Sequence, residues 1–189
     1  MILSYGASSD LLIEAVNSIR EKLGISFNDY PIDIFSAIDN YAYLTVVEED
    51  FSAKGLCGFL IRNRLPEASV IVVNGNMSDT DKQFAVCHEL IHYFCHPADI
   101  GNKLFTASHK KYLRTPIEQQ ANEGAAELLA PAKLIIPDLR TAMDYYKDRN
   151  IAIKETAKAY GVAPRVIERR INNLGIDLEE TIHELRSQV

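Results

Sequence analysis

A pentapeptide in the middle of the chain, His88-Glu89-Leu90-Ile91-His92, places two imidazoles four residues apart, with a carboxylate beside the first. Residues at positions i and i+4 lie on the same face of an α-helix, so a helix would bring both rings to one metal ion. Glu89 would lie about 100° around that helix from His88, near the metal but free to handle a proton. The H-E-x-x-H spacing therefore predicts a helix that carries a zinc hydrolase site.

The surrounding sequence favours a metal site over the alternative, which is a core helix with two hydrogen-bonded histidines. Ser78 can cap the start of the helix, with Asp81 three residues later, and Pro97 marks its exit. Apolar residues lie on most sides of this helix: Phe84, Val86, Cys87, Leu90, Ile91, Phe94 and Cys95. Two histidines in a buried helix need polar partners, and one metal ion would satisfy both.

A catalytic zinc ion usually takes three protein ligands and leaves one position for water. His96 is the nearest further histidine, but it follows His88 by eight residues, about 12 Å along a helix axis. Ligands spread that far along one helix cannot converge on one ion. We therefore interpret His96 as a residue that favours the C-terminal end of the helix dipole.

A second predicted helix supplies better candidates for the third ligand. Thr115 can cap this helix, Pro116 suits its first position, and Pro131 ends it. Spacing alone leaves both Glu118 and Glu123 open as ligands, with Glu118 favoured. Glu118 also completes a capping-box pattern that begins at Thr115. This alternative interpretation of Glu118 requires no metal.

The two motifs together resemble the ImmA/IrrE family of metallopeptidases, whose pattern is H-E-L-G-H followed by E-x-x-A-N-x-F-A-A-x-L-L-M-P. In this chain, H-E-L-I-H is followed after 25 residues by E-Q-Q-A-N-E-G-A-A-E-L-L-A-P, a gluzincin-like layout. The resemblance implies that His88, His92 and Glu118 bind Zn²⁺ and that Glu89 is the catalytic base. It also implies that Asn122 holds a ligand imidazole through its ring N–H.

Two positions depart from the family pattern. Ile91 stands where the family has glycine, and we expect it to leave less room beside the metal. Gly124 stands where the family has phenylalanine, so a large packing group is missing from the second helix. Neither change removes a ligand, and we expect both to affect substrate fit more than metal binding.

The resemblance implies a zinc-dependent intracellular peptidase. Its protein substrate would typically be a helix-turn-helix repressor of a mobile element, such as a phage, or of a stress regulon. Two alternatives stay open, which are a non-catalytic zinc-containing protein that regulates a repressor or toxin by binding alone, and a DNA-binding regulator. Within the long polar connection over residues 98–115, His109 or Tyr112 could stabilise the oxyanion of the reaction.

Periodicity predicts an α+β fold, mostly helical with a small three-stranded antiparallel sheet, and the family resemblance implies that the domain is zincin-like. Helices are expected over residues 10–23 and after Pro31, and strands over residues 43–47, 56–61 and 69–74. Residues 63–66 resemble a hairpin turn between the last two strands. An exposed strand edge beside the zinc helix could bind an extended peptide by adding it to the sheet.

We expect residues 1–135 to form the zincin-like metallopeptidase domain and residues 136–189 a C-terminal helical module. Residues 153–174 of this module resemble a helix-turn-helix, and they carry five Lys or Arg side chains against two Glu. DNA binding is one interpretation of this stretch. A packing module is favoured, because the ImmA/IrrE resemblance continues into a similar stretch that accompanies the peptidase.

Composition bounds the remaining possibilities. A net charge of −6 over 189 residues argues against nucleic-acid binding across the whole surface. Cys57, Cys87 and Cys95 are odd in number and not spaced as zinc pairs, which favours buried free thiols and a reducing cytoplasm. The sequence has no signal-peptide pattern and no run of about 20 apolar residues that would span a membrane. We therefore expect a cytoplasmic protein.

Overall fold

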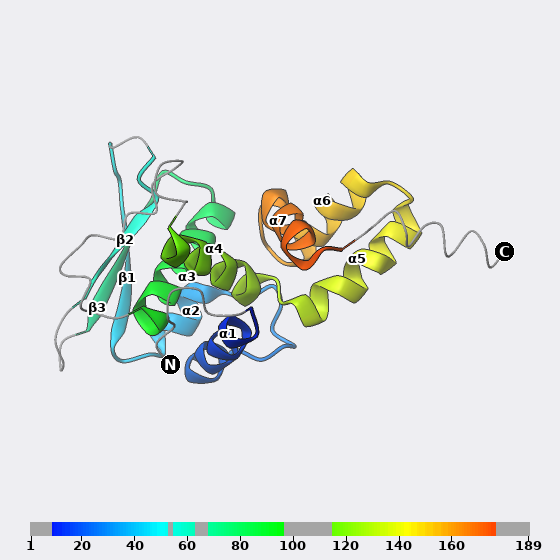
Figure 1. Ribbon diagram of the computed structural model, residues 1–189. Coiled ribbons are helices and arrows are strands. Elements are labelled where there is room, and N and C mark those ends of the chain that lie inside the picture. The colour runs from blue at the N-terminus through cyan, green and yellow to red at the C-terminus, as the bar shows by residue number, and fades with distance from the viewer. Residues whose placement is uncertain (1–8, 53–54, 63–67, 97–114, 177–189) are drawn as a thin grey trace. The chain divides into compact units, whose positions relative to one another are not determined.

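The computed structural model describes residues 9–52, 55–62, 68–96 and 115–176 (Figure 1). The chain divides into two compact units. The first unit is formed by residues 1–26 and 33–128, and the second by residues 27–32 and 129–189. Among the described residues, no helix is both long and apolar enough to cross a membrane.

The first unit contains a three-stranded sheet, with β1 (Leu44–Glu49), β2 (Gly58–Ile61) and β3 (Ser69–Asn74) in the order β1-β3-β2. β2 and β3 pair antiparallel, with Gly58 opposite Val73 and Ile61 opposite Val70. β1 and β3 pair parallel, with Leu44 opposite Ser69 and Glu49 opposite Asn74. The sheet is therefore mixed, and the prediction of a purely antiparallel sheet is wrong.

The error concerns the order of the strands and not their direction. Each strand does reverse the direction of the one before it, but β3 inserts between β1 and β2 and so runs parallel to β1. β3 has the most continuous apolar run, and Ile71, Val72 and Val73 are buried. A strand buried in this way suits the centre of a sheet, whereas β1 ends in the exposed Glu48 and Glu49, which suit an edge.

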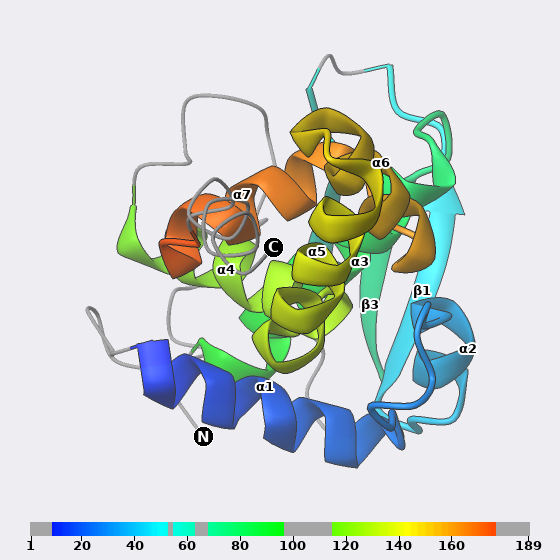
Figure 2. The same cartoon turned by 90° about the vertical axis from the view of Figure 1, so that its right-hand side faces the viewer.

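Three helices that the sequence pattern predicts belong to this unit together with the sheet. α1 (Ser9–Leu23) is amphipathic, and its buried face carries Leu12, Ala15, Val16, Ile19 and Leu23. It ends at Gly24, whose φ of 68° is a left-handed conformation that favours glycine. α2 (Ile34–Asp39) lies against β1 (Figure 2), and both α1 and α2 contact α3 (Asp79–Cys95).

α3 is the helix that the H-E-x-x-H motif predicts, and it begins where predicted. Ser78 is its N-cap and accepts a hydrogen bond from the backbone N–H of Asp81 at 3.3 Å. The helix packs against β2 and β3, and its residues from Ala85 to His92 are all buried. Packing on both sides makes α3 a rigid support for the side chains of the motif.

α4 (Pro116–Leu129) is the second predicted helix. The hydroxyl of Thr115 accepts a hydrogen bond from the N–H of Glu118 at 3.3 Å, which confirms the predicted cap. At the other end, the buried guanidinium of Arg20 donates to the carbonyls of Glu127 and Leu128. Because this side chain comes from α1, the C-terminal end of α4 is tied to another helix of the same unit.

The second unit contains α5 (Ala132–Tyr146), α6 (Arg149–Ala159) and α7 (Pro164–Leu174). The C-terminal part of α6 and the whole of α7 fall within the stretch that resembles a helix-turn-helix, but two helices and a turn alone do not establish a DNA-binding module. Arg170 is 5% exposed and donates through Nε to the carbonyl of Ala130 at 3.1 Å. One of the five basic side chains in this stretch therefore takes part in packing.

Candidate metal centre

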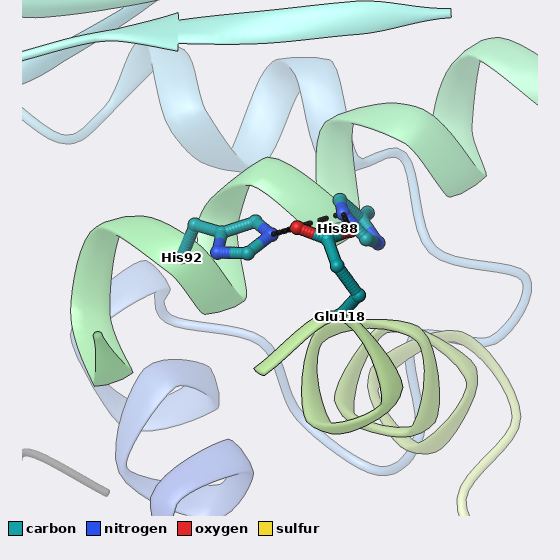
Figure 3. Close-up of side chains that lie close together, drawn as sticks. All are labelled: His88, His92 and Glu118. Carbon is teal, nitrogen blue, oxygen red and sulfur yellow. Dashed lines mark hydrogen bonds and ion pairs between the residues drawn. The ribbon is translucent and has the colours of Figure 1, made fainter. Parts of the chain in front are cut away.

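Three donor side chains from two helices meet in the first unit (Figure 3). His88 and His92 come from successive turns of α3, and Glu118 comes from the first turn of α4. The Nε2 atoms of the two histidines lie 3.0 Å apart. Glu118 places Oε2 at 3.2 Å from Nε2 of His88 and Oε1 at 3.4 Å from Nε2 of His92.

These separations are of the size that a zinc site requires. Donor atoms that lie about 2.0–2.1 Å from one ion in tetrahedral geometry are about 3.3 Å from each other. The two Nε2 atoms are 3.0 Å apart, and each lies 3.2–3.4 Å from a different oxygen of the Glu118 carboxylate. Among the described residues, no other His, Cys, Asp or Glu joins this group, and three protein ligands are the number that a catalytic zinc ion usually takes.

The protonation states of these residues also suit a divalent cation. Burial lowers the pKa of His92 to about 4, so the ring is neutral at pH 7 and has a lone pair to share. Burial acts to raise the pKa of Glu118, but hydrogen bonds with His88 and His92 outweigh it and bring the value to about 2. The set is therefore a neutral imidazole and an anionic carboxylate beside a second imidazole, which is the donor chemistry that zinc prefers.

Glu89 is not one of the three donors, although it adjoins His88 in sequence. Its side chain is fully buried, and neither carboxylate oxygen has a hydrogen-bond partner among the described residues. Burial and the charge of Glu118 raise the pKa of Glu89 well above its usual value, against a lowering effect from Arg62. A buried carboxylate with a raised pKa and no structural partner is a candidate for proton transfer.

Asn122 is buried, and its amide donates to the backbone carbonyl of Glu118, one turn earlier on α4, at 2.7 Å. Glu123, the second candidate ligand, is not part of the donor group. His109 and Tyr112 lie outside the described residues.

His96 contacts the centre in a way that the sequence analysis missed. Its Nδ1 lies 2.9 Å from Nδ1 of His92, on the side of that ring opposite to the donor atom Nε2. Burial lowers the pKa of His96 to about 4, against a raising effect from the side chain of Gln120. The i, i+4 spacing from His92 to His96 was the available signal, because it places adjacent rings on one helix face.

The two departures from the family pattern are in direct contact. A Cβ atom added at Gly124 would lie 2.8 Å from Cγ1 and 2.9 Å from Cδ1 of Ile91, both closer than van der Waals contact allows. Ile91 is fully buried and β-branched, so it has little freedom to move away. The large side chain thus lies on α3 in this chain, and the small residue that accommodates it lies on α4.

This packing predicts strong coupling between the two positions. We expect Gly124→Ala to destabilise the protein by about 1–3 kcal/mol through overpacking, although alanine favours helices. Ile91→Ala should cost about 2–5 kcal/mol through the cavity that it leaves. Because alanine at 124 would fill part of that cavity, the double variant should lose less stability than the sum of the single variants. Chemical denaturation of all four proteins measures this difference, and additive losses would show that the two side chains are independent.

A family model described as the IrrE N-terminal-like domain of peptidase family M78 matches residues 40–172. A solved structure described as a Mycobacterium tuberculosis transcriptional regulator matches with a TM-score of 0.57 and 15% identity, over 86% of this chain and 46% of that chain. At this identity the likeness shows the fold alone, and this chain spans less than half the length of that protein.

No curated protein matches the sequence. The family model, in contrast, covers well over half of the chain, including α3 with its H-E-x-x-H motif and the whole of α4. The resemblance inferred from the two motifs is therefore confirmed, and the chain belongs to the M78 peptidase family, with an IrrE N-terminal-like domain.

Proposed function

We propose that this protein is a zinc-dependent peptidase, in which His88, His92 and Glu118 hold the metal and Glu89 is the catalytic base. The observation that carries the proposal is the approach of the two Nε2 atoms to each other and to the Glu118 carboxylate at 3.0–3.4 Å, together with the buried carboxylate of Glu89, which has no hydrogen-bond partner among the described residues. Membership of a peptidase family supports the reaction class. The donor set, with two imidazoles and one carboxylate, supports zinc as the metal.

The residues divide the chemistry between them. Bound at this centre, zinc would lower the pKa of a water molecule and polarise the scissile carbonyl. Glu89 accepts the proton of the attacking water, and its raised pKa makes the carboxylate a stronger base than a solvated glutamate. The same carboxyl group then donates that proton to the leaving amine. Glu118 is held by its contacts with both histidines, so it keeps the donor atoms of α3 and α4 together.

The sheet supports a binding mode for an extended substrate. β1 and β2 are the two edges of the sheet, and β2 packs against the helix that carries the motif. We propose that a peptide segment pairs with the edge of β2 that no other described strand covers, because backbone hydrogen bonds there need no particular substrate sequence. Side-chain preferences would then come from residues of the strand such as Ile61, which is 42% exposed.

The substrate that we propose is a helix-turn-helix repressor of a mobile element or stress regulon, as the ImmA/IrrE resemblance implies. A role in gene control agrees with the description of the Mycobacterium tuberculosis protein of similar fold as a transcriptional regulator. The compartment that we propose is the cytoplasm. Cys57, Cys87 and Cys95 form no disulfide with one another, which suits a reducing compartment.

Removal of the metal tests this function. The protein should bind one zinc ion per chain and cleave a small helix-turn-helix repressor encoded beside its gene. A chelator should abolish cleavage, because the reaction requires the metal ion. Added Zn²⁺ should restore cleavage, because the three donor side chains can bind the ion again. Mass spectrometry of the repressor and metal analysis of the protein give the two measurements. Cleavage that survives complete removal of the metal would contradict the proposal, and an intact repressor in a stable complex would favour regulation by binding alone.

A further inference from the structure

The ring of His92 can bind a metal in only one of its two neutral forms. A neutral imidazole has one protonated nitrogen and one with a lone pair. Nε2 of His92 is the atom that faces His88 and Glu118, so its lone pair is available only when the proton is on Nδ1. A group that accepts a hydrogen bond from Nδ1–H therefore favours the tautomer of His92 that binds a metal.

That group is the ring of His96. The two Nδ1 atoms are 2.9 Å apart, which is a hydrogen bond that holds a single proton. If His92 donates this proton, its Nε2 is free for a metal. If His96 donates instead, His92 must carry its own proton on Nε2 and faces the centre with an N–H group. This hydrogen bond thus links the tautomer of the His92 ring to that of the His96 ring.

Burial and backbone hydrogen bonds hold His96 in position next to His92. It is 3% exposed and forms the C-cap of α3, where its N–H donates to the carbonyl of His92 at 3.2 Å. Arg62, which follows β2, donates to the carbonyls of His96 at 3.0 Å and Tyr93 at 3.1 Å, and also to that of His92. These bonds fix the backbone from which the His96 ring projects. By contrast, Nδ1 of His88 has no partner among the described residues.

We propose that His96 is a positioning residue, whose Nδ1 accepts the hydrogen bond from Nδ1–H of His92 and keeps that ring in its metal-binding form. The inference rests on the proposed function, since it assigns a role toward the same zinc ion. Metal-binding histidines usually donate this N–H to a carboxylate, a backbone carbonyl or water. Here the acceptor is a second imidazole, that of His96 at the C-cap of the same helix.

Zinc affinity of the full-length, metal-free protein tests the proposal. His96→Phe keeps a ring but removes the acceptor, and it should weaken zinc binding about 10–100-fold. His96→Asn offers an amide oxygen near the position of Nδ1 and should bind zinc almost as tightly as the unchanged protein. Cys95→Ala alters the adjacent buried residue and should have no effect on affinity. Competition with a chromophoric chelator measures all four, and the absorption spectrum of the Co²⁺ form reports distortion of the centre.

A second measurement does not depend on how well the variants fold. In the zinc-loaded, unchanged protein with ¹⁵N-labelled histidine, NMR should show the Nδ1–H of His92 in a hydrogen bond to Nδ1 of His96, as a scalar coupling between the two ¹⁵N nuclei. Absence of that coupling would overturn the proposal, as would a folded His96→Phe protein that binds zinc as tightly as the unchanged one. Failure of the unchanged protein to bind zinc would overturn the proposed function as well. Zinc binding that is lost in Glu118→Gln but unaffected in His96→Phe would overturn only the role of His96.

Discussion

Glu89→Gln should leave zinc bound and reduce cleavage of the repressor by about 10²–10⁴-fold, the range that positioned acid–base groups contribute. An amide has almost the shape of a carboxylate but cannot accept the proton of the attacking water. Both carboxylate oxygens of Glu89 lack hydrogen-bond partners among the described residues, so the change breaks no bond in the described structure. It also removes a buried group that can become charged, so the free energy of unfolding should stay the same or rise.

The control for this variant is Glu123→Gln on α4, which makes the same chemical change at a partly exposed residue outside the donor group. It should cleave at the unchanged rate. Cleavage and metal content should be measured on the same preparations, so that loss of the base is separated from loss of zinc. A Glu89→Gln protein that contains zinc and cleaves at the unchanged rate would remove Glu89 from the mechanism.

Glu118→Gln should weaken zinc binding by more than the roughly 10–100-fold that is typical of residues that only support a ligand. The variant loses the negative charge and the contacts at 3.2 and 3.4 Å with the two histidines. Cleavage should fall in proportion to the zinc that is lost at a given concentration, and excess Zn²⁺ should restore part of it. Titration of the metal-free protein with zinc gives the affinity, and the cleavage rate is followed over the same titration.

The choice of glutamine separates the two readings of Glu118. Glutamine serves as well as glutamate at the third position of a helix in a capping box, so a purely structural Glu118 would tolerate the change. Under that reading, zinc affinity and helix stability would both be unchanged. Asn122→Ala is a useful comparison, because it removes the 2.7 Å bond to the backbone of Glu118 while leaving the carboxylate in place. Its effect on zinc binding should be the smaller of the two.

Helical spacing made much of the centre predictable from the sequence. The positions of His88 and His92 on one face follow from 3.6 residues per turn, and the caps at Ser78 and Thr115 depend only on neighbouring residues. These are local properties, so α3 and α4 begin where the sequence places them. That Glu118 lies opposite the two histidines was implied by the family pattern and not by spacing, which left Glu123 open.

The structure changed the interpretation wherever segments distant in sequence meet. Nothing local in residues 44–74 says that β3 inserts between β1 and β2, because strand order depends on which strand most needs burial on both sides. Ile91 and Gly124 looked like two separate departures, and the fold brings them together as one packing contact. Arg62 gave no signal in the sequence, yet from the end of β2 it binds three carbonyls at the C-terminus of α3.

His96 marks the boundary between the two kinds of information. The sequence by itself determined that this residue is too far from His88 to share its metal ion, since that follows from the rise of a helix. Only the tertiary structure decided that its ring turns back to Nδ1 of His92, because that orientation depends on burial and on the bonds of Arg62 to the helix end. Backbone periodicity is a property of neighbouring residues, whereas the direction of a buried side chain is set by everything packed around it.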